Sequence, residues 1–170
     1  MTVYVALLRA VNVGGRQLKM VELRRLAEGL GHRSVTTHIA SGNLLLVSDG
    51  AERTVKAELE EALAAHMGKP VSVMVRTAAE MAAVVDANPF PDEPGDRTVA
   101  IFLDNPTRAD AVSMATNVEE ERLSVGRREI YVHYPKGQGR SKLKIPAAAE
   151  GTARNMNTVA KLAELAKELA

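Results

Sequence analysis

Two short apolar runs, 3–8 and 44–47, place the tightest limit on how this chain can fold. Neither run contains a charged residue, a pattern typical of strands that have a neighbour on each side and cover on both faces. The runs 35–39 and 71–75 instead carry β-branched residues at every second position, on one face, with more polar or flexible residues between them, which is typical of edge strands. The sequence therefore predicts a sheet with two central strands and two edge strands.

Helical patterns separate these strands. Apolar residues recur at helical spacing over 23–30 and over 55–67, which predicts two amphipathic helices. The order is then strand, helix, strand, strand, helix, strand. Right-handed crossovers close this order into a sandwich of one sheet and two helices. The predicted fold class for residues 1–76 is α+β, a ferredoxin-like βαββαβ sandwich.

The second half of the chain restarts the pattern. A capping box from Thr77 to Glu80 starts a connecting helix, and a proline-rich stretch follows it, so residues 77–97 are predicted to link two halves. Beyond the link we expect strands at 98–103, 122–125 and 129–134 and helices at 107–118 and 155–169. Residues 98–170 are therefore predicted to be an incomplete second copy without a clear fourth strand. Because the central strands are apolar on both faces, we expect the halves to pack as one unit.

Composition narrows the functional classes. The 170 residues carry a formal net charge of +1, which argues against a general polyanion binder. There is no cysteine, so disulfides and thiol nucleophiles are excluded. The four histidines have no metal-ligand spacing, and we expect neither a metal nor a cofactor. Without a signal peptide or a spanning segment, we expect a cytoplasmic protein with no membrane partner, as a monomer or weak homodimer.

Two polar turns form the first candidate site. One follows the first strand and the other joins the second and third strands, so the predicted topology places both at one end of the sheet. Backbone N–H groups freed by glycine, together with arginine and amide side chains, are suited to an anion. The residues are Arg9, Asn12, Gly14, Gly15, Ser41 and Asn43. Ordinary turn chemistry explains the same residues as an alternative.

A second polar zone lies near the C-terminus. Residues 136–144 contain four cations and no acid, and a polar helix start follows at 151–158. Cations and a helix N-terminus together suit a phosphate or a carboxylate. The candidate residues are Lys136, Arg140, Lys142, Arg154, Asn155 and Asn157. The alternative is a solvated basic loop beside an ordinary N-cap.

These patterns favour a binding module for a small anionic ligand bearing phosphate or carboxylate. A phosphoryl-group hydrolase is the first alternative, because acylphosphatases place an arginine after the first strand of such a sandwich and an asparagine beyond it, as Arg9 and Asn43 stand here. A protein interaction module with no small ligand is the second. The central strands lack the aromatic residues of an RNA-recognition motif, so sequence-specific nucleic-acid binding is not expected. Whether the protein is an enzyme stays open.

The same motifs carry a family resemblance. The stretches 9–15, 20–23, 41–43 and 151–159 resemble the signatures of bacterial domain-of-unknown-function family 1697. The resemblance implies a cytoplasmic bacterial protein with a ferredoxin-like, internally duplicated architecture and no established activity. The chain departs from the family pattern at Met156, where a tryptophan is usual, and at Ala40, where a larger polar residue is common. If that tryptophan stacks on a ligand in relatives, stacking is weakened here.

Overall fold

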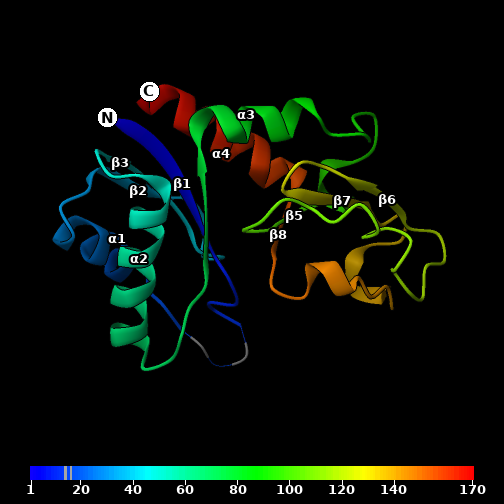
Figure 1. The fold of residues 1–170 in the computed structure, drawn as a ribbon, viewed down its shortest axis with the longest axis horizontal. Coiled ribbons are helices and arrows are strands. Elements are labelled where there is room, and N and C mark those ends of the chain that lie inside the picture. The colour runs from blue at the N-terminus through cyan, green and yellow to red at the C-terminus, as the bar shows by residue number, and fades with distance from the viewer. Residues whose placement is uncertain (14, 16) are drawn as a thin grey trace. The chain divides into compact units, whose positions relative to one another are not determined.

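A computed structural model describes residues 1–13, 15 and 17–170 of the chain (Figure 1). The chain divides into two compact units. The first unit comprises Met1–Met81 and Leu162–Ala170, and the second unit comprises Ala82–Lys161. Each unit contains its own four-stranded antiparallel sheet, so the expected mixed class of helices and strands is confirmed.

The sheet of the first unit has the strand order β2-β3-β1-β4. Its elements are β1 (Thr2–Leu8), α1 (Met20–Gly29), β2 (Arg33–Thr37), β3 (Asn43–Ser48), α2 (Glu52–Met67) and β4 (Val73–Thr77). This is the element order that periodicity predicted. The prediction that the first and third strands are central and the other two lie at the edges is also confirmed.

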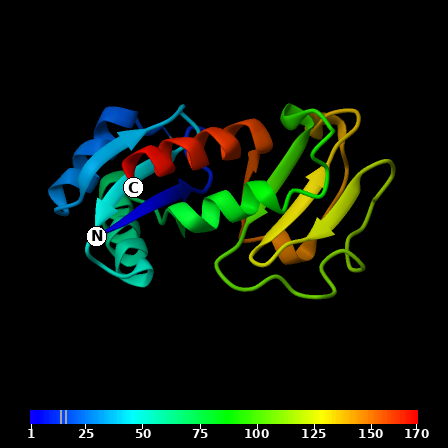
Figure 2. The ribbon, with the colours of Figure 1, turned by 90° about the horizontal axis from the view of Figure 1, so that it is seen from above.

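Strand β1 is buried on both faces. On one face it packs against the apolar stripes of α1 and α2 in a single cluster. Side chains on the other face, such as Val5, are buried equally completely. The last turns of α4 (Met156–Leu169) belong to the first unit and lie close to the start of β1 in both ribbon views (Figures 1 and 2). Leu162 and Ala166 in these turns are buried.

A helix side-chain pair secures the start of edge strand β4. Lys56 Nζ donates to Glu60 Oε2 at 2.9 Å and to the Val73 carbonyl at 2.6 Å. The Val73 N–H donates to Glu60 Oε2 at 3.0 Å. Both backbone groups of Val73 are thus bound by α2, which satisfies polar atoms that an edge strand would leave to water.

The connecting helix α3 (Ala78–Asp86) begins at the predicted capping box. The Thr77 N–H donates to Glu80 Oε1 at 2.9 Å, and the Glu80 N–H donates to Thr77 Oγ1 at 3.1 Å. Two N–H groups at the helix start are therefore satisfied by reciprocal side-chain bonds.

The sheet of the second unit has the order β6-β7-β5-β8. Its strands are β5 (Thr98–Phe102), β6 (Arg122–Val125), β7 (Glu129–His133) and β8 (Thr152–Asn155), with 3₁₀ turns η1 (Gly95–Arg97), η2 (Gln138–Arg140) and η3 (Pro146–Ala148). The prediction that a fourth strand is missing was wrong, because β8 pairs with β5 along its whole length. A polar Thr-Ala-Arg-Asn segment becomes a strand through this pairing and not through its own pattern.

The helix predicted over 107–118 was also wrong. The segment forms turns, and Thr116 instead exchanges backbone hydrogen bonds with Lys144 at 2.9 and 3.0 Å. Thr107 donates through its N–H to the Arg127 carbonyl and through its hydroxyl to the Glu129 carbonyl. Val112, Met114 and Val118 are exposed, so no apolar helix face is buried here.

None of the helices in the described residues is long and apolar enough to cross a membrane.

Gly42 should be irreplaceable at the turn before β3. It has φ +89°, and an added Cβ would lie 2.7 Å from Val11 Cγ2 and 2.9 Å from Leu8 Cβ. We expect Gly42→Ala to destabilise the protein by about 2–4 kcal/mol, from left-handed strain plus overpacking. Gly68→Ala is the matched control, since Gly68 has φ +70° in open space and only the strain of about 1–2 kcal/mol applies. Equal losses in urea unfolding would contradict the close approach at Gly42.

Candidate functional site

Hydrogen bonds from Asn12 join the two polar turns of the first unit. Asn12 Nδ2 donates to the Leu18 carbonyl at 3.0 Å and to the Ala40 carbonyl at 2.5 Å. Asn12 Oδ1 accepts from the Leu18 N–H at 2.7 Å. The amide therefore ties the loop after β1 both to itself and to the β2–β3 hairpin.

Asn43 closes the hairpin from the other side. Its side chain is fully buried, and Nδ2 donates to the His38 carbonyl at 2.9 Å and to Ser41 Oγ at 3.0 Å. The Asn43 carbonyl accepts from the His38 N–H at 3.0 Å. Both amide protons of Asn43 are committed to the turn.

The backbone of these turns is strained. Ala10, Asn12 and Ile39 have φ of 57°, 57° and 53°. Positive φ is unusual for alanine and a genuine outlier for a β-branched residue such as Ile39. The hydrogen bonds of Asn12 and Asn43 hold the turns in this conformation.

The remaining residues predicted for this site differ in their exposure. Arg9 is half-buried, and its N–H donates to the Ser72 carbonyl at 2.9 Å. Ser41 is exposed beside Asn43, and Gly15 is exposed with φ +84°. Gly14 lies outside the described residues.

The second polar zone is divided by the structure. Lys136 and Arg140 line one pocket, whereas Lys142 is exposed and does not line it. Arg154 is buried on β8, donates to Thr152 Oγ1 at 2.7 Å and to the Ala153 carbonyl at 2.9 Å, and burial lowers its pKa to about 10.

The two asparagines of this zone have structural surroundings. Asn155 Oδ1 accepts from the Thr158 N–H at 2.9 Å and so caps α4. Asn157 lies so close to Gly95 that no Cβ fits there. Neither asparagine lines the pocket of Lys136 and Arg140.

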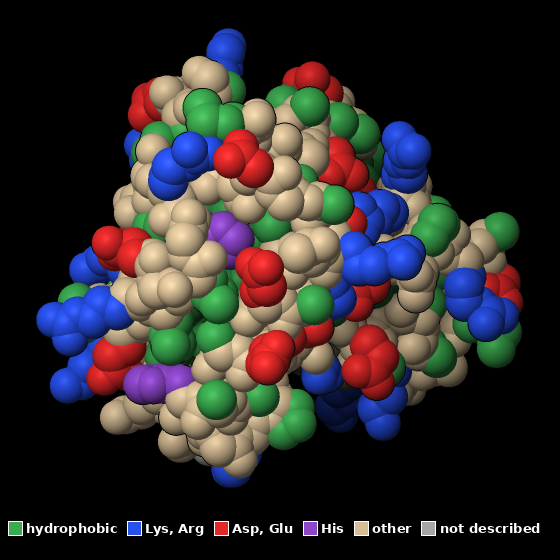
Figure 3. Space-filling view, turned by 60° about the vertical axis from the view of Figure 1, so that its left-hand side comes forward, with side chains coloured by type: hydrophobic (Ala, Val, Ile, Leu, Met, Phe, Trp, Pro, Cys, Tyr) green, Lys and Arg blue, Asp and Glu red, His purple; other side chains and the backbone are tan. Residues whose placement is uncertain are grey.

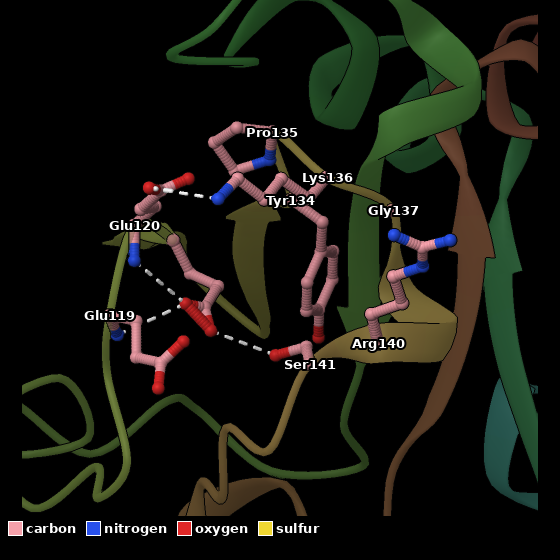
Figure 4. Close-up of a pocket in the computed structure, with 9 residues that line it drawn as sticks. Glu119, Glu120, Tyr134, Pro135, Lys136, Gly137, Arg140 and Ser141 are labelled. Carbon is pink, nitrogen blue, oxygen red and sulfur yellow. Dashed lines mark hydrogen bonds and ion pairs between the residues drawn. The ribbon is translucent and has the colours of Figure 1, made fainter.

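That pocket lies wholly within the second unit (Figure 4). It has a volume of about 60 Å³. Its walls are the acidic segment 119–121 before β6 and the segment 134–141 after β7. Sequence reasoning did not place the acidic segment 119–121 beside these cations.

The Glu121 carboxylate is surrounded by hydrogen-bond donors in this pocket, and this set of donors is called the Glu121 niche. Its Oε2 accepts from the N–H groups of Glu119 and Glu120, each at 3.1 Å, and its Oε1 accepts from the Ser141 hydroxyl at 2.8 Å. Backbone N–H groups, its own first, and the Ser141 hydroxyl lower the pKa of Glu121 below its ordinary value of 4.5. Donors that could have held an external anion thus already hold an internal carboxylate.

Strand register explains why these residues meet. Arg122 pairs with His133 at the end of the β6–β7 ladder. Continuing the ladder by one pair sets Glu121 opposite Tyr134, and Lys136 Nζ lies 3.3 Å from Glu120 Oε1. The alternation of this hairpin is the sequence signal that could have found the acidic wall.

Tyr134 and Arg140 are among the pocket residues whose polar side-chain groups have no protein partner in the described part of the chain. Tyr134 is only 7% exposed, and its hydroxyl has no hydrogen-bond partner among the residues that the structure describes. Burial, and secondarily the charge of Glu121, raise the pKa of Tyr134, so the hydroxyl keeps its proton at neutral pH. Arg140 is exposed and has no ion-pair partner within the described part of the chain.

A buried histidine and threonine elsewhere in the second unit are satisfied internally. His133 Nδ1 lies 3.0 Å from Thr98 Oγ1, and His133 Nε2 lies 3.4 Å from Glu93 Oε2. Although this resembles a hydroxyl–imidazole–carboxylate triad, Thr98 is fully buried and its hydroxyl donates to the Pro94 carbonyl at 3.2 Å. A buried hydroxyl that cannot reach a substrate is structural.

A larger hollow of about 230 Å³ lies beside Met114 and Pro146. Its two charged residues, Arg108 and Asp110, already pair at 2.9 Å. No group of three or more potential metal ligands occurs within the described ranges. Charges of both signs are interspersed over the face shown in Figure 3, in keeping with the near-zero net charge.

These observations define a mixed α/β protein of two units with a small polar pocket in the second. The family model described as "Protein of unknown function (DUF1697)" matches residues 1–131, and the chain belongs to this family, as its motifs indicated. No curated protein matches this sequence. A conserved bacterial protein from Streptococcus pneumoniae is similar in structure, with a TM-score of 0.83 and 25% identity over 98% of this chain and 99% of that chain.

The side-chain amide of Asn12 should contribute more to the free energy of unfolding than relief of backbone strain at this position alone. We expect Asn12→Ala to cost about 2–4 kcal/mol, because the N–H of buried Leu18 loses its partner and alanine is strained at φ 57°. Asn117→Ala is the matched control: Asn117 has the same φ of 57° and no side-chain hydrogen bond in the described chain. Its loss in urea unfolding should be about 1 kcal/mol, and similar losses for both variants would reject the joining role of Asn12.

Glu121 should make stability depend on acid pH. Because its pKa is lowered by folding, its contribution is present above pH 4.5 and is lost as the pH falls through the folded pKa. The difference in Tm between the wild type and Glu121→Gln should therefore shrink between about pH 6 and about pH 3. Exposed Glu150, replaced by glutamine, serves as the control. A difference that does not change with pH would show that the carboxylate charge is not what the niche holds.

Proposed function

We propose that the protein binds a small anionic ligand and that the head group of this ligand lies in the pocket of the second unit. The observation that carries this proposal is the Tyr134 hydroxyl. It belongs to a residue that is only 7% exposed, it keeps its proton, and it borders the pocket without a protein partner among the described residues. Because this hydroxyl reaches the pocket and no protein group accepts from it, it can donate a hydrogen bond to a ligand there. Arg140 beside it supplies a cation with a bidentate donor fork.

The charges of the pocket favour a carboxylate over a phosphate. Three glutamates and two cations line it. A phosphate dianion would meet more repulsion from the glutamates than a carboxylate carrying a single charge. Within the proposed class, a carboxylate is therefore the better match.

In the first unit, we propose Arg9, Gly15 and Ser41 as a second region of anion contact. Support comes from the joining of the two turns by Asn12 and from the position of Arg9 directly after a rigid central strand. Asn12 and Asn43 act there by holding the turns. A hydrolase is disfavoured, because both Asn43 amide protons are already used and none is left to position water.

We also propose that both units are ferredoxin-like and that the second is a copy of the first. Their sheets share one strand order. Buried Arg76 and Arg154 occupy matching places, each one residue before the strand ends and a helix begins, and each donates to the carbonyl of the preceding residue. The second unit differs by having turns where α1 and α2 stand in the first.

Binding should depend on Arg140 and weaken with salt. We expect acetate to raise the Tm of the wild type, and Arg140→Ala to weaken acetate binding by about tenfold or more, because a charge-assisted contact is lost. Added NaCl should weaken binding through screening, whereas lowering the pH from about 8 to about 6 should change it little, because arginine keeps its charge. Lys142→Ala removes a neighbouring cation outside the pocket and is the matched control.

The same titrations discriminate between the two regions. A loss on Arg9→Ala with none on Arg140→Ala would move the anion site to the first unit. Equal small losses on Arg140→Ala and Lys142→Ala would reject a specific pocket in favour of a general basic surface.

A further inference from the structure

We infer that the ligand of the second-unit pocket is a zwitterion that carries an ammonium group beside its carboxylate, as a free α-amino acid does. This inference rests on the proposed function, since it names the ligand class of the same site. It goes beyond anion binding because it assigns a role to the acidic wall that 119–121 forms.

Three of the five charged side chains around the pocket already have partners. Lys136 is paired with Glu120 at 3.3 Å, and Glu121 is held by two N–H groups and one hydroxyl. Glu119 and Arg140 are then left, and neither side chain has an ionic or hydrogen-bond partner in the part of the chain that the structure describes. Both side chains are exposed at the pocket, so one acid and one cation are accessible to ligand groups of opposite sign.

The positions of Glu119 and Arg140 also favour such a ligand. In the view of Figure 4, Glu119 lies on one side of Tyr134 and Arg140 on the other. They form no ion pair with each other across the pocket. A ligand with a positive and a negative end can satisfy both, with its carboxylate at Arg140 and its ammonium at Glu119.

Tyr134 suits a ligand that spans the two charges. Its hydroxyl can donate a hydrogen bond to a carboxylate, and the same oxygen can accept a hydrogen bond from an ammonium group. A neutral hydroxyl next to both ends adds hydrogen bonds without adding charge.

The size of the pocket limits what is recognised. A volume of about 60 Å³ has room for a head group of a few heavy atoms but not for a long side chain. The ammonium, the α-carbon and the carboxylate of an amino acid make such a head group. The rest of the ligand lies outside, so the pocket selects the head group more than the side chain.

Simpler ligands leave part of the site unsatisfied. A plain carboxylate would satisfy Arg140 but leave Glu119 as a repulsive neighbour. A plain amine would satisfy Glu119 but leave Arg140 unpaired. Only a ligand with both groups gives Glu119 and Arg140 each a partner of opposite sign.

The test compares three probes by isothermal titration of the full chain: L-alanine, N-acetyl-L-alanine without the ammonium, and L-alaninamide without the carboxylate. We expect L-alanine to bind at least about tenfold more tightly than either derivative. Glu119→Gln should weaken L-alanine binding by about tenfold while changing N-acetyl-L-alanine binding less than about twofold. Arg140→Ala should weaken both, and Lys142→Ala neither.

The outcomes separate the inference from the proposed function. N-acetyl-L-alanine binding as tightly as L-alanine, or no effect of Glu119→Gln, overturns the zwitterion and leaves anion binding intact. L-alaninamide binding as tightly as L-alanine overturns the carboxylate contact. No binding of L-alanine, N-acetyl-L-alanine or acetate overturns both. Thermal melting without ligand checks that each variant is folded, and Tyr134→Phe, which keeps the ring, tests the hydroxyl if Arg140→Ala does not fold.

Discussion

The burial of β1 on both faces is the constraint on which the first unit depends. A strand that is apolar on both sides requires cover on both, and α1 with α2 can supply only one. Once β1 is fixed, pairing of Leu7 with Asn43 fixes where the β2–β3 hairpin turns. The loop that begins at Arg9 and the turn at Gly42 then meet, because the Leu8 N–H donates to the Gly42 carbonyl at 2.9 Å. The geometry of both polar turns therefore follows from sheet register.

Elements that bury a periodic face could be predicted from the sequence, whereas elements that depend on a distant partner could not. The runs 3–8 and 44–47 and the capping box at Thr77 carry their own local signals, and the structure contains all three. Strand β8 carries none, since its polar segment is a strand only because β5 supplies hydrogen bonds. The turns at 107–118 show the converse. The segment has the local pattern of a helix, but Thr107 and Thr116 form hydrogen bonds with other segments instead.

The pocket illustrates the same division at the level of side chains. Lys136 and Arg140 could be named from the sequence, because clustered cations indicate an anion. Glu121 could have been added only by extending the β6–β7 register one pair beyond its last ladder partner. The open hydroxyl of Tyr134 could not be predicted at all, because openness is the lack of a partner and depends on every surrounding segment. The sequence around a tyrosine at the end of a strand is the same whether or not its hydroxyl is hydrogen-bonded.

The residue types that usually contact ligands are therefore not the residues whose side chains lack protein partners in this structure. Asparagine and serine in turns attract attention because their short side chains can bind backbone-like groups, and that ability is what the turns themselves use. Asn12 satisfies Leu18 and Ala40, Asn43 satisfies His38, and Asn155 caps α4, so their donors and acceptors are committed before any ligand arrives. Long side chains at the rim of a pocket have no such local alternative. Arg140 and Glu119 consequently carry charge that a ligand can still meet.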